Sequence, residues 1–583
     1  MRVQARLHVH GWVYSYPSEL SSRNNTNYMP ELQEIQTPRA SKSKEILARI
    51  DSSVDRHQNL WSYALLAAGL LVRIWHASGT FLNSDEVMHF AAANHTSWLE
   101  TYRVSLAISH PPLLIFVLHV WRALGTSELT LRMPSILAGI AFCWFTFRWA
   151  EMLFQKSVTW TMFVFVLFLP SSIELSTEIR QYALFLAFAM GSAYFLERAL
   201  AKNSAGTMLL SGVCLWLAIG SHFSAFLFAP ALGIYAIWRM LSSRPLLRVI
   251  AAWVAGQLVA VALCGFLYVT QIRQLSQYFG GQDATQGWMG NAYLSHSYFI
   301  PGKVNPLVFI IGRTVGVFQY VFRQLLVGDI AFVLFIVGLV IVFRSRPVSS
   351  RVTSRHLGWL LLLPFAFNCA AALVRAYPYG GTRHSCMLIP FALAGVSVAL
   401  AQLMKHKVFS GMAAALLISL VCHLSTAKEL PYVAPDAQRS ANMEAAMAFI
   451  HQLPTEEPIF ADVQTNLMLG HYLCNQRPFV SDRSIPGFVS YECGGHRVIA
   501  STTKYIFTAK SFYDQWQEMV AKYHVQPGKK IWVAQMGWYT YVAFELGNFP
   551  QFHLAPHYFG PQIQIFDLKV GQIMPDPNLL PTT

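Results

Sequence analysis

The 583-residue chain contains few charged residues. Only 12% of its residues are Asp, Glu, Lys or Arg, whereas 54% are hydrophobic. Soluble proteins usually carry roughly 25% charged residues. This composition excludes an ordinary soluble protein and indicates a polytopic α-helical membrane protein with some soluble mass. The formal net charge of +14 accompanies no basic stripe or nucleic-acid motif, so we expect no nucleic-acid partner.

Other features are missing as well. The sequence has no glycine-rich phosphate loop, which argues against an ATP-driven pump. It has no Cys/His cluster with metal-ligand spacing, so we predict no metal and no other cofactor. No cleavable signal precedes the first apolar run, which begins near Leu60. Residues 1–58 predict a disordered cytoplasmic tail.

Cysteine is scarce, with eight residues in the chain. Two of them, Cys474 and Cys493, lie in the polar C-terminal part. They could form a disulfide if that part lies outside the cytoplasm, or they could remain two free thiols. The other six lie in apolar runs and are typical of small core residues: Cys143, Cys214, Cys264, Cys369, Cys386 and Cys422.

Apolar runs of roughly twenty residues predict membrane spans. We expect eleven spans in a transmembrane domain of residues 59–425: 60–79, 134–154, 157–175, 181–199, 206–220, 222–240, 247–270, 328–344, 356–376, 384–403 and 407–425. Two further runs, 111–125 and 306–325, carry histidine or arginine. We expect these two to be interfacial or re-entrant helices.

The charge of the short loops supports this count. With the N-terminus inside, every short loop rich in Lys and Arg falls on the cytoplasmic side, as the positive-inside rule requires. Counting only one of the two doubtful runs as a span would place many of these Lys/Arg-rich loops on the opposite side of the membrane. The segments predicted to lie outside are then 80–133, 176–180, 271–327, 377–383 and everything from about 426 onward.

Two of the predicted external segments are large. From residue 426 to 583, helix-like and strand-like patterns alternate, as in "NMEAAMAFIHQL", "PIFADV", "KSFYDQWQEMVAKY", "KKIWVAQM" and "QIQIFDLKV". They predict a soluble α/β domain. The loop 271–327 is long for a connector, and it is either a lid over a lipid substrate or a passive interfacial loop.

Most costly polar residues fall on the predicted outer side. Ionisable groups at membrane depth usually face a cavity or a partner, so acids and arginines gathered at one face predict a site for an anionic, membrane-bound substrate. They lie in five short stretches: "NSDEVMHF", "HPPLL", "ELTLRMPSILAG", "STEIRQYAL" and "YPYGGTRHSCMLIP".

These five stretches, in this order, resemble the GT-C superfamily of membrane glycosyltransferases. The resemblance is strongest to the branch of dolichyl-phosphate-mannose–protein mannosyltransferases and bacterial aminoarabinose transferases, and it covers roughly residues 60–425. It implies inverting transfer of a sugar from a polyprenyl-phosphate-linked donor to a lipid, glycan or protein acceptor outside the cytoplasm. The short loops suggest a bacterial inner (plasma) membrane.

The resemblance also implies roles for the acidic pair. Asp85 would be the base that takes the acceptor's proton, and Glu86 would orient the site or the acceptor. Because some members of the superfamily use a divalent ion, the two acids together could also hold one, although none is predicted. The alternative is that both are solvated loop residues or acids at a helix N-terminus.

Cationic and aromatic residues complete the predicted site. Arg383, Arg180, Arg132 and His110 are candidates for binding the donor phosphate. Ion pairs with Glu178 or Glu174, or snorkelling to the lipid headgroups, are the alternatives for Arg180 and Arg132, and packing against prolines is the alternative for His110. Further substrate-binding candidates are Tyr182, Tyr379, His222 and His89, of which His222 is more typical of a core histidine and His89 of a support for the acids.

Two rival functions remain. A transporter or flippase of a lipid-linked saccharide would also need many spans and cationic external groups, but the sequence shows no two-fold internal repeat and a transporter needs no acidic pair beside a phosphate site. An inactive relative that binds a partner through its C-terminal domain is a third interpretation, and the intact acidic pair argues against it.

Overall fold

The computed structural model describes residues 49–54, 56–274, 294, 296–345, 353–424, 438–477, 487–502, 504–538, 540–548 and 554–571. Residues Ile50–Thr583 form one compact unit, which contains everything below. Most of the predicted N-terminal tail, and the part of the predicted lid between residues 275 and 293, lie outside the described residues.

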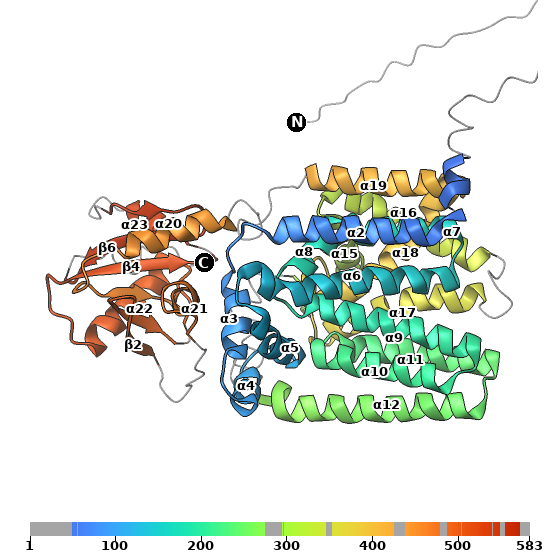
Figure 1. The fold of residues 1–583 in the computed structure, drawn as a ribbon, viewed down its shortest axis with the longest axis horizontal. Helices are drawn as coiled ribbons and strands as arrows, with labels where there is room; N and C mark the ends of the chain where they lie inside the picture. The colour runs from blue at the N-terminus through green and yellow to red at the C-terminus, as the bar shows by residue number, and fades with distance from the viewer. Residues whose placement is uncertain are drawn as a thin grey trace, which may run out of the picture. The chain divides into compact units, whose positions relative to one another are not determined.

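Long apolar helices form the bundle, which confirms the polytopic helical architecture (Figure 1). By length and composition, the described residues contain eight helices able to cross a membrane, or nine if a bent pair counts as one span. The eight begin with α2 (Gln58–Ala77), α6 (Glu128–Leu153), α9 (Tyr182–Lys202) and α11 (Ala225–Ser243). The others are α12 (Leu247–Leu267) continued by η2 (Tyr268–Ile272), α16 (Leu325–Arg344), α17 (Ser354–Leu373), and η4 (Arg383–Leu388) continued by α18 (Ile389–Leu403).

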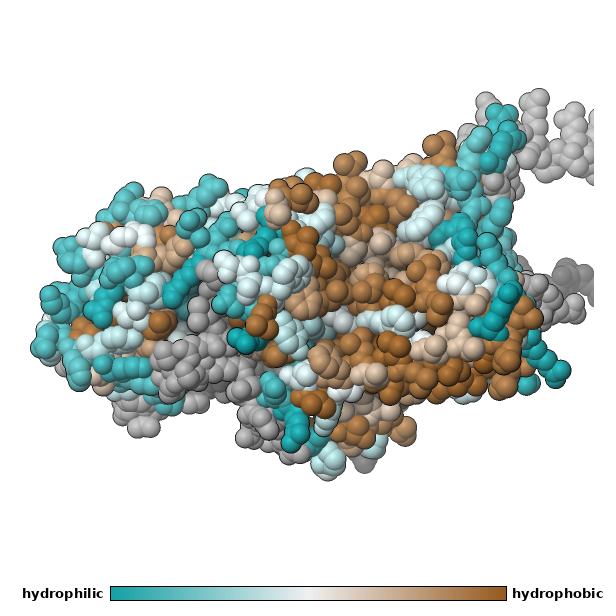
Figure 2. Space-filling model, turned by 60° about the horizontal axis from the view of Figure 1, so that its bottom comes forward, coloured by the Kyte–Doolittle hydropathy of each residue, from teal (hydrophilic) through white to brown (hydrophobic). Residues whose placement is uncertain are grey.

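Two of the eleven predicted spans form apolar helices that are too short to be counted among these eight. The runs 206–220 and 407–425 form α10 (Ala205–Ser221) and α19 (Val408–Leu424), of 17 residues each. Both pack along other apolar helices, α10 on α9 and α12, and α19 on α7. Side chains on the surface of the bundle form a broad hydrophobic area, whereas the surface of the C-terminal domain is mostly hydrophilic (Figure 2).

The bent pair is α7 (Lys156–Phe168) and α8 (Pro170–Thr177), which meet at 51°. Pro170 begins α8 and has no N–H to donate, so the helix breaks there. The buried Arg73 of α2 bridges the break, with Nη1 donating to the carbonyl oxygen of Leu167 at 2.9 Å and Nε donating to the hydroxyl of Ser176 at 2.8 Å. This break directs α8 toward the segment 178–181, which carries part of the site.

The two doubtful runs are also helical. Residues 111–125 form the short α5 (Leu113–Trp121) and η1 (Arg122–Leu124), and 306–325 forms α15 (Pro306–Phe322). Along α15, Thr314 Oγ1 lies 2.7 Å from Tyr379 Oη. At its end, Arg323 is ion-paired with Glu174 of α8. Both contacts lie at the end of the bundle that carries residues 178–181 and 377–384, hereafter the site end.

The C-terminal domain contains a six-stranded sheet of order β2-β3-β1-β4-β6-β5. Strands β3 (His496–Ser501), β1 (Ile459–Ala461) and β4 (Lys530–Met536) are parallel. The antiparallel strands are β2 (Phe488–Cys493), β6 (Ile563–Lys569) and β5 (His557–Tyr558). The helices are α20 (Ser440–Ile450), α21 (Val463–Tyr472), α22 (Ala509–Lys522) and α23 (Val542–Gly547). All five segments predicted as helix or strand are confirmed, as α20, β1, α22, β4 and β6.

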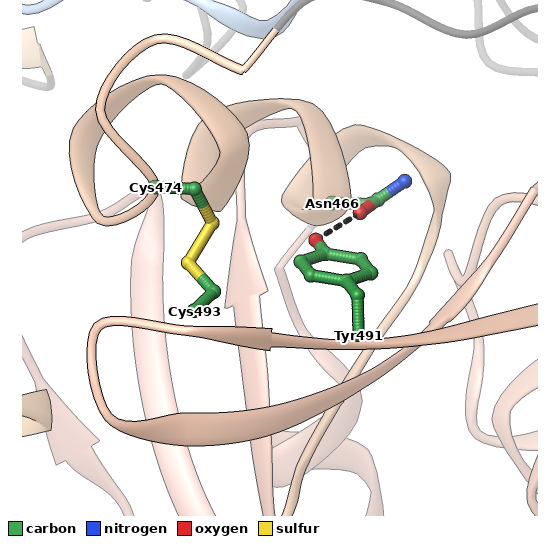
Figure 3. Close-up of a disulfide and its surroundings, with 4 residues drawn as sticks. All are labelled: Asn466, Cys474, Tyr491 and Cys493. Carbon is green, nitrogen blue, oxygen red and sulfur yellow. Dashed lines mark hydrogen bonds between the residues drawn. A yellow bond between two sulfur atoms is a disulfide. The ribbon is translucent and has the colours of Figure 1, made fainter.

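The two cysteines of the C-terminal domain form a disulfide. Cys474, just after α21, is joined to Cys493 at the end of β2 (Figure 3). Tyr491 of the same strand donates a hydrogen bond to Asn466 of α21. The disulfide therefore fastens α21 to the sheet and decides between the two alternatives that the sequence left open.

Helix α21 also packs against α3 (Ser84–Ala93), which follows α2 and precedes α4 (Trp98–Ser105). Phe90 of α3 meets the ring of His471 at 5.5 Å, and the Tyr472 hydroxyl accepts a hydrogen bond from Leu82 N at 2.7 Å. Buried apolar residues of α3, α20, α21 and the sheet belong to one hydrophobic cluster. The sheet domain thus shares a core with the helix that carries the acidic pair.

Candidate active site

Asp85 lies at the centre of a cluster of charges at the site end of the bundle. It is in the first turn of α3 and its side chain is 18% exposed. Its Oδ2 atom is ion-paired with Nη2 of Arg180 and lies 3.6 Å from Nη2 of Arg383. The structure therefore brings together the predicted base and two of the predicted phosphate ligands.

Glu178 and Tyr182 complete the surroundings of Arg383. Glu178 Oε2 lies 3.6 Å from Arg383 Nη1, and the guanidinium stands 5.9 Å from the centre of the Tyr182 ring. Burial raises the pKa of Glu178, and the positive charge of Arg383 opposes that change. Two carboxylates and two guanidiniums meet here, so an anionic ligand can replace a carboxylate as the partner of an arginine.

Two glycines make the position of Arg383 possible. Gly380 has a φ of +132°, a conformation that favours glycine. A Cβ atom on Gly381 would lie 2.8 Å from the Gly316 carbonyl oxygen of α15. Close packing of this turn on α15 therefore needs glycine at both positions, and it directs the start of η4 toward Asp85.

Glu86 has a different position from its neighbour. Its side chain is fully buried and closes a capping box with Asn83, in which Glu86 Oε2 accepts from Asn83 N and Asn83 Oδ1 accepts from Glu86 N, both at 3.0 Å. Oε1 also accepts from Ile179 N at 2.9 Å. Glu86 thus begins α3 and ties it to the segment 178–181.

Arg132 is the partner of Glu86 and does not reach Asp85. Its Nε and Nη2 atoms donate to the two Glu86 oxygens at 2.8 Å each. Nη1 and Nη2 donate further to the carbonyl oxygens of Ala77, Thr80 and Phe81, each at 2.9 Å. Every guanidinium nitrogen of this buried arginine is engaged, so the structure gives Arg132 a role in holding the chain between α2 and α3, in place of the expected contact with phosphate.

Three histidines form a row beside the charged cluster. The ring of His110 lies 6.0 Å from that of His89 and 5.6 Å from that of His222, and Tyr182 contacts His222 at 5.0 Å. Gln271, at the end of η2, fixes His110 by donating to its carbonyl oxygen at 2.6 Å. The site thus contains all of the predicted histidines.

The hydrogen bonds of two histidines define their tautomers. His89 Nδ1 lies 2.6 Å from the Asp85 carbonyl oxygen, so it carries the proton and leaves Nε2 as an acceptor. In His222, Nδ1 accepts from Ser224 N at 3.2 Å, so its proton is on Nε2. Burial, with a smaller contribution from the charge of Arg180, lowers the pKa of His89 to about 4. Burial and the neighbouring histidines hold the pKa of His110 well below its usual value. The rings of His89 and His110 are therefore neutral at pH 7.

Tyr379 lies away from the charged cluster. It is buried, its hydroxyl contacts Thr314, and its N–H donates to the Ser297 carbonyl oxygen at 2.9 Å. Its position supports the 377–384 turn. Tyr377, which the sequence did not place in the site, contacts Ser224 Oγ at 2.8 Å and so joins the turn to the row of histidines.

No group of three or more His, Cys, Asp or Glu side chains suited to a metal ion occurs among the described residues. The positive charge near Asp85 comes from the two arginines. A ligand that needs cations at this position can therefore obtain them from the protein's own side chains.

The model of the dolichyl-phosphate-mannose-protein mannosyltransferase family matches residues 109–268. This segment contains His110, Glu178, Arg180, Tyr182 and His222. The resemblance to membrane glycosyltransferases of the GT-C superfamily is thereby confirmed for this part of the chain. No curated relative matches the chain.

Several solved structures are similar over most of the chain. ArnT from Cupriavidus metallidurans in the apo state matches 88% of this chain and 98% of its own, with 14% identity and a TM-score of 0.48. The same protein bound to undecaprenyl phosphate matches with 13% identity, covers 88% and 99% of the two chains and has the same TM-score of 0.48. An oligosaccharyltransferase from Archaeoglobus fulgidus, tethered with an acceptor peptide, covers 82% and 69% with 11% identity and a TM-score of 0.44. Similarity at this level does not establish the function, so the function is inferred from the chemistry of the site.

Proposed function

From this site and the mannosyltransferase-type segment, we propose that the chain transfers a sugar, with inversion, from a polyprenyl-phosphate-linked donor to an acceptor at the outer face of the membrane. The observation that carries the proposal is the meeting of Asp85 with Arg180 and Arg383. Inverting transfer from a lipid phosphate needs a base for the acceptor and cations for the leaving phosphate. The family whose model matches residues 109–268 is named for a dolichyl-phosphate-linked donor, which supports the donor class.

In this mechanism, Arg383 and Arg180 bind the donor phosphate and stabilise the negative charge that grows on it as its bond to the sugar breaks. The acceptor hydroxyl attacks the anomeric carbon from the opposite side and gives its proton to Asp85. Glu178 holds Arg383 in place through the second carboxylate contact. The products are the glycosylated acceptor and a polyprenyl phosphate, and the proton leaves Asp85 for solvent afterwards.

Compartment and metal use are part of the same proposal. Disulfides persist in oxidising compartments, so the Cys474–Cys493 bond supports a sheet domain outside the cytoplasm. We propose that the protein lies in a bacterial inner membrane with its N-terminus inside. We further propose that transfer needs no divalent metal, because two guanidiniums supply the charge at the phosphate. A chelator such as EDTA should leave the rate unchanged, and loss of transfer restored by Mg²⁺ or Mn²⁺ would overturn this point.

The test of the main proposal is transfer from a radiolabelled polyprenyl-phosphate sugar in membranes that contain the full-length protein. Wild type should form a labelled product with inverted anomeric configuration, measured by NMR. Asp85→Asn should not, while Asp514→Asn, which removes an exposed carboxylate of α22, serves as the matched control. Movement of the labelled lipid across the membrane without a product would favour a flippase instead.

A further inference from the structure

A hollow lies between α6 and α9 at the end of the bundle opposite the site end. Its volume is about 440 Å³, which falls in the range of roughly 300–1,000 Å³ that is usual for ligand sites. Arg148 of α6 and Arg198 and Lys202 of α9 line it, together with the acid Glu151. Three cations and one carboxylate give this lining a net positive charge, which favours an anionic ligand. We call it the cationic hollow.

Both arginines of the hollow lie against an aromatic ring one turn earlier in their own helix. The Arg148 guanidinium is 5.5 Å from the centre of the Trp144 ring, and that of Arg198 is 5.7 Å from the centre of the Tyr194 ring. Arg198 Nη1 also donates a hydrogen bond to the Tyr194 hydroxyl. Contact between the rings of Tyr194 and Phe145, at 6.1 Å, joins α9 to α6. Because a guanidinium has five N–H donors, each arginine is held in place and still has donors for a ligand.

Ordinary stabilisation of helix ends accounts for only one of the three cations. Lys202 lies in the last turn of α9, where the helix macrodipole favours positive charge. Arg198 lies one turn earlier, and α6 has no basic residue in its last turn. Within the hollow, the ion pair formed by the described residues joins Arg148 to Glu151. Arg198 and Lys202 therefore contribute positive charge that no described carboxylate neutralises.

The length of the helices places the hollow at the depth of lipid headgroups. Arg148 lies twenty residues beyond Glu128, the first residue of α6, and a rise of about 1.5 Å per residue makes this about 30 Å. That distance is about the thickness of the hydrocarbon core of a bilayer. Next to the hollow, Trp144 stacks at 5.6 Å on Tyr63 of α2, which is 59% exposed. Exposed tyrosine and tryptophan are typical of the membrane–water interface, so two observations agree on this depth.

We propose that the cationic hollow binds the headgroup phosphate of an anionic phospholipid, with Arg198 and Lys202 as its main ligands and Arg148 as the third cation. This site goes beyond the proposed sugar transfer and uses none of its residues. Its depth, and the broad hydrophobic surface of the bundle (Figure 2), favour a lipid over a free anion. In the proposed orientation this end meets the cytoplasmic leaflet, whose anionic lipids attract basic groups.

The experiment titrates purified, delipidated full-length protein in detergent with phosphatidylglycerol and, separately, with phosphatidylcholine, and counts bound lipids by native mass spectrometry. Wild type should bind one phosphatidylglycerol tightly and no phosphatidylcholine with that affinity. Arg198→Gln combined with Lys202→Gln should weaken this binding about 30-fold, since each cation near a membrane surface is worth about fivefold. Arg198→Lys combined with Lys202→Arg keeps both charges and should keep most of the binding. Arg344→Gln combined with Arg355→Gln, which removes two exposed arginines of α16 and α17, is the matched control and should change nothing.

Thermal unfolding of the same samples separates a lipid from a free anion. Phosphatidylglycerol should raise the unfolding midpoint of wild type, because a ligand that binds only the folded state stabilises it, whereas inorganic phosphate at the same concentrations should not. An equal rise with inorganic phosphate would make the hollow a site for a soluble anion and overturn the inference. Equal affinity of wild type for the two lipids, unchanged binding in the double Gln variant, or an equal loss in the control variant would also overturn it. If the double Gln variant does not fold, the variant that keeps both charges decides, and loss of binding in that variant, once folded, counts against the hollow.

Discussion

Replacing Asp85 by Asn should change donor binding and sugar transfer in opposite directions. Without a donor, Asp85 is a partner of both Arg180 and Arg383, so the donor phosphate must displace this carboxylate before it can bind both arginines. Asn keeps the shape and removes the charge. The donor phosphate therefore no longer competes with a carboxylate for the two arginines, but the base that would accept the proton of the acceptor is lost.

The structure allows a rough magnitude. Unit charges 3.6 Å apart interact by about 5 kcal/mol at an effective dielectric constant of about 20. Solvent at the partly exposed Asp85 and the cost of desolvation reduce the net value to about 1–2 kcal/mol. Affinity for polyprenyl phosphate should therefore rise about 5- to 30-fold, whereas the rate of transfer should fall by about 10²–10⁴.

The assay is titration of purified protein with a short-chain polyprenyl phosphate, by calorimetry, next to the transfer assay on the same samples. Glu178→Gln should give a smaller gain in affinity, since it removes only one contact of Arg383 at 3.6 Å. Asp514→Asn should leave both quantities unchanged. Weaker donor binding in Asp85→Asn would refute the idea that the carboxylate and the phosphate compete for the same arginines, and transfer at the wild-type rate would refute its role as the base.

Three further predictions concern stability. Glu86→Gln leaves the buried Arg132 without its carboxylate, so it should cost about 3–5 kcal/mol and lower the midpoint of thermal unfolding; a midpoint equal to that of Asp514→Asn would contradict the structural role of the pair. Cys493→Ser removes a disulfide that spans 19 residues, so it should cost about 2–4 kcal/mol and make α21 a new site of limited proteolysis; an unchanged digest would argue against the fastening of α21. The pKa of His89 is lowered to about 4, so the unfolded chain binds more protons than the folded one between pH 4 and 6.5, and stability must rise with pH in that window. At pH 5 the loss relative to pH 7 should be about 2 kcal/mol, and His89→Gln should remove that part of the pH dependence, which denaturant titrations at the two pH values can measure.

The sequence predicted the large elements because their signals are local. Each predicted span and each of the five segments of the sheet domain shows a continuous apolar run or a clear periodicity, and all correspond to helices or strands. The strands β2 and β3 were not predicted because their sequences, "FVSYEC" and "HRVIAS", are short and mix polar with apolar residues. Span lengths also differed: the runs 206–220 and 407–425 form helices of 17 residues each, packed on α9 and α12 and on α7.

The site was less predictable because its assignments depend on contacts between distant segments. Arg132 and Arg180 look alike in the sequence, each an arginine beside an apolar run, yet only Arg180 reaches Asp85. Glu178 and Tyr377 lie within the stretches that suggested the family, but nothing in their spacing shows that one contacts Arg383 and the other Ser224. Such pairings are set by the break at Pro170 and by the glycine turn at 380–381.

The two adjacent acids illustrate how local geometry divides one motif into two roles. Successive residues of a helix point about 100° apart, so Asp85 and Glu86 cannot share a direction. Asn83, three residues before Glu86, satisfies the capping-box pattern, and this signal alone would have assigned Glu86 to the start of α3. Once Glu86 is turned inward to Asn83 and Arg132, Asp85 must point toward Arg180 and Arg383. The buried pair therefore aims the carboxylate that we propose as the base, and a change at Glu86 should damage transfer through the orientation of Asp85 as well as through stability.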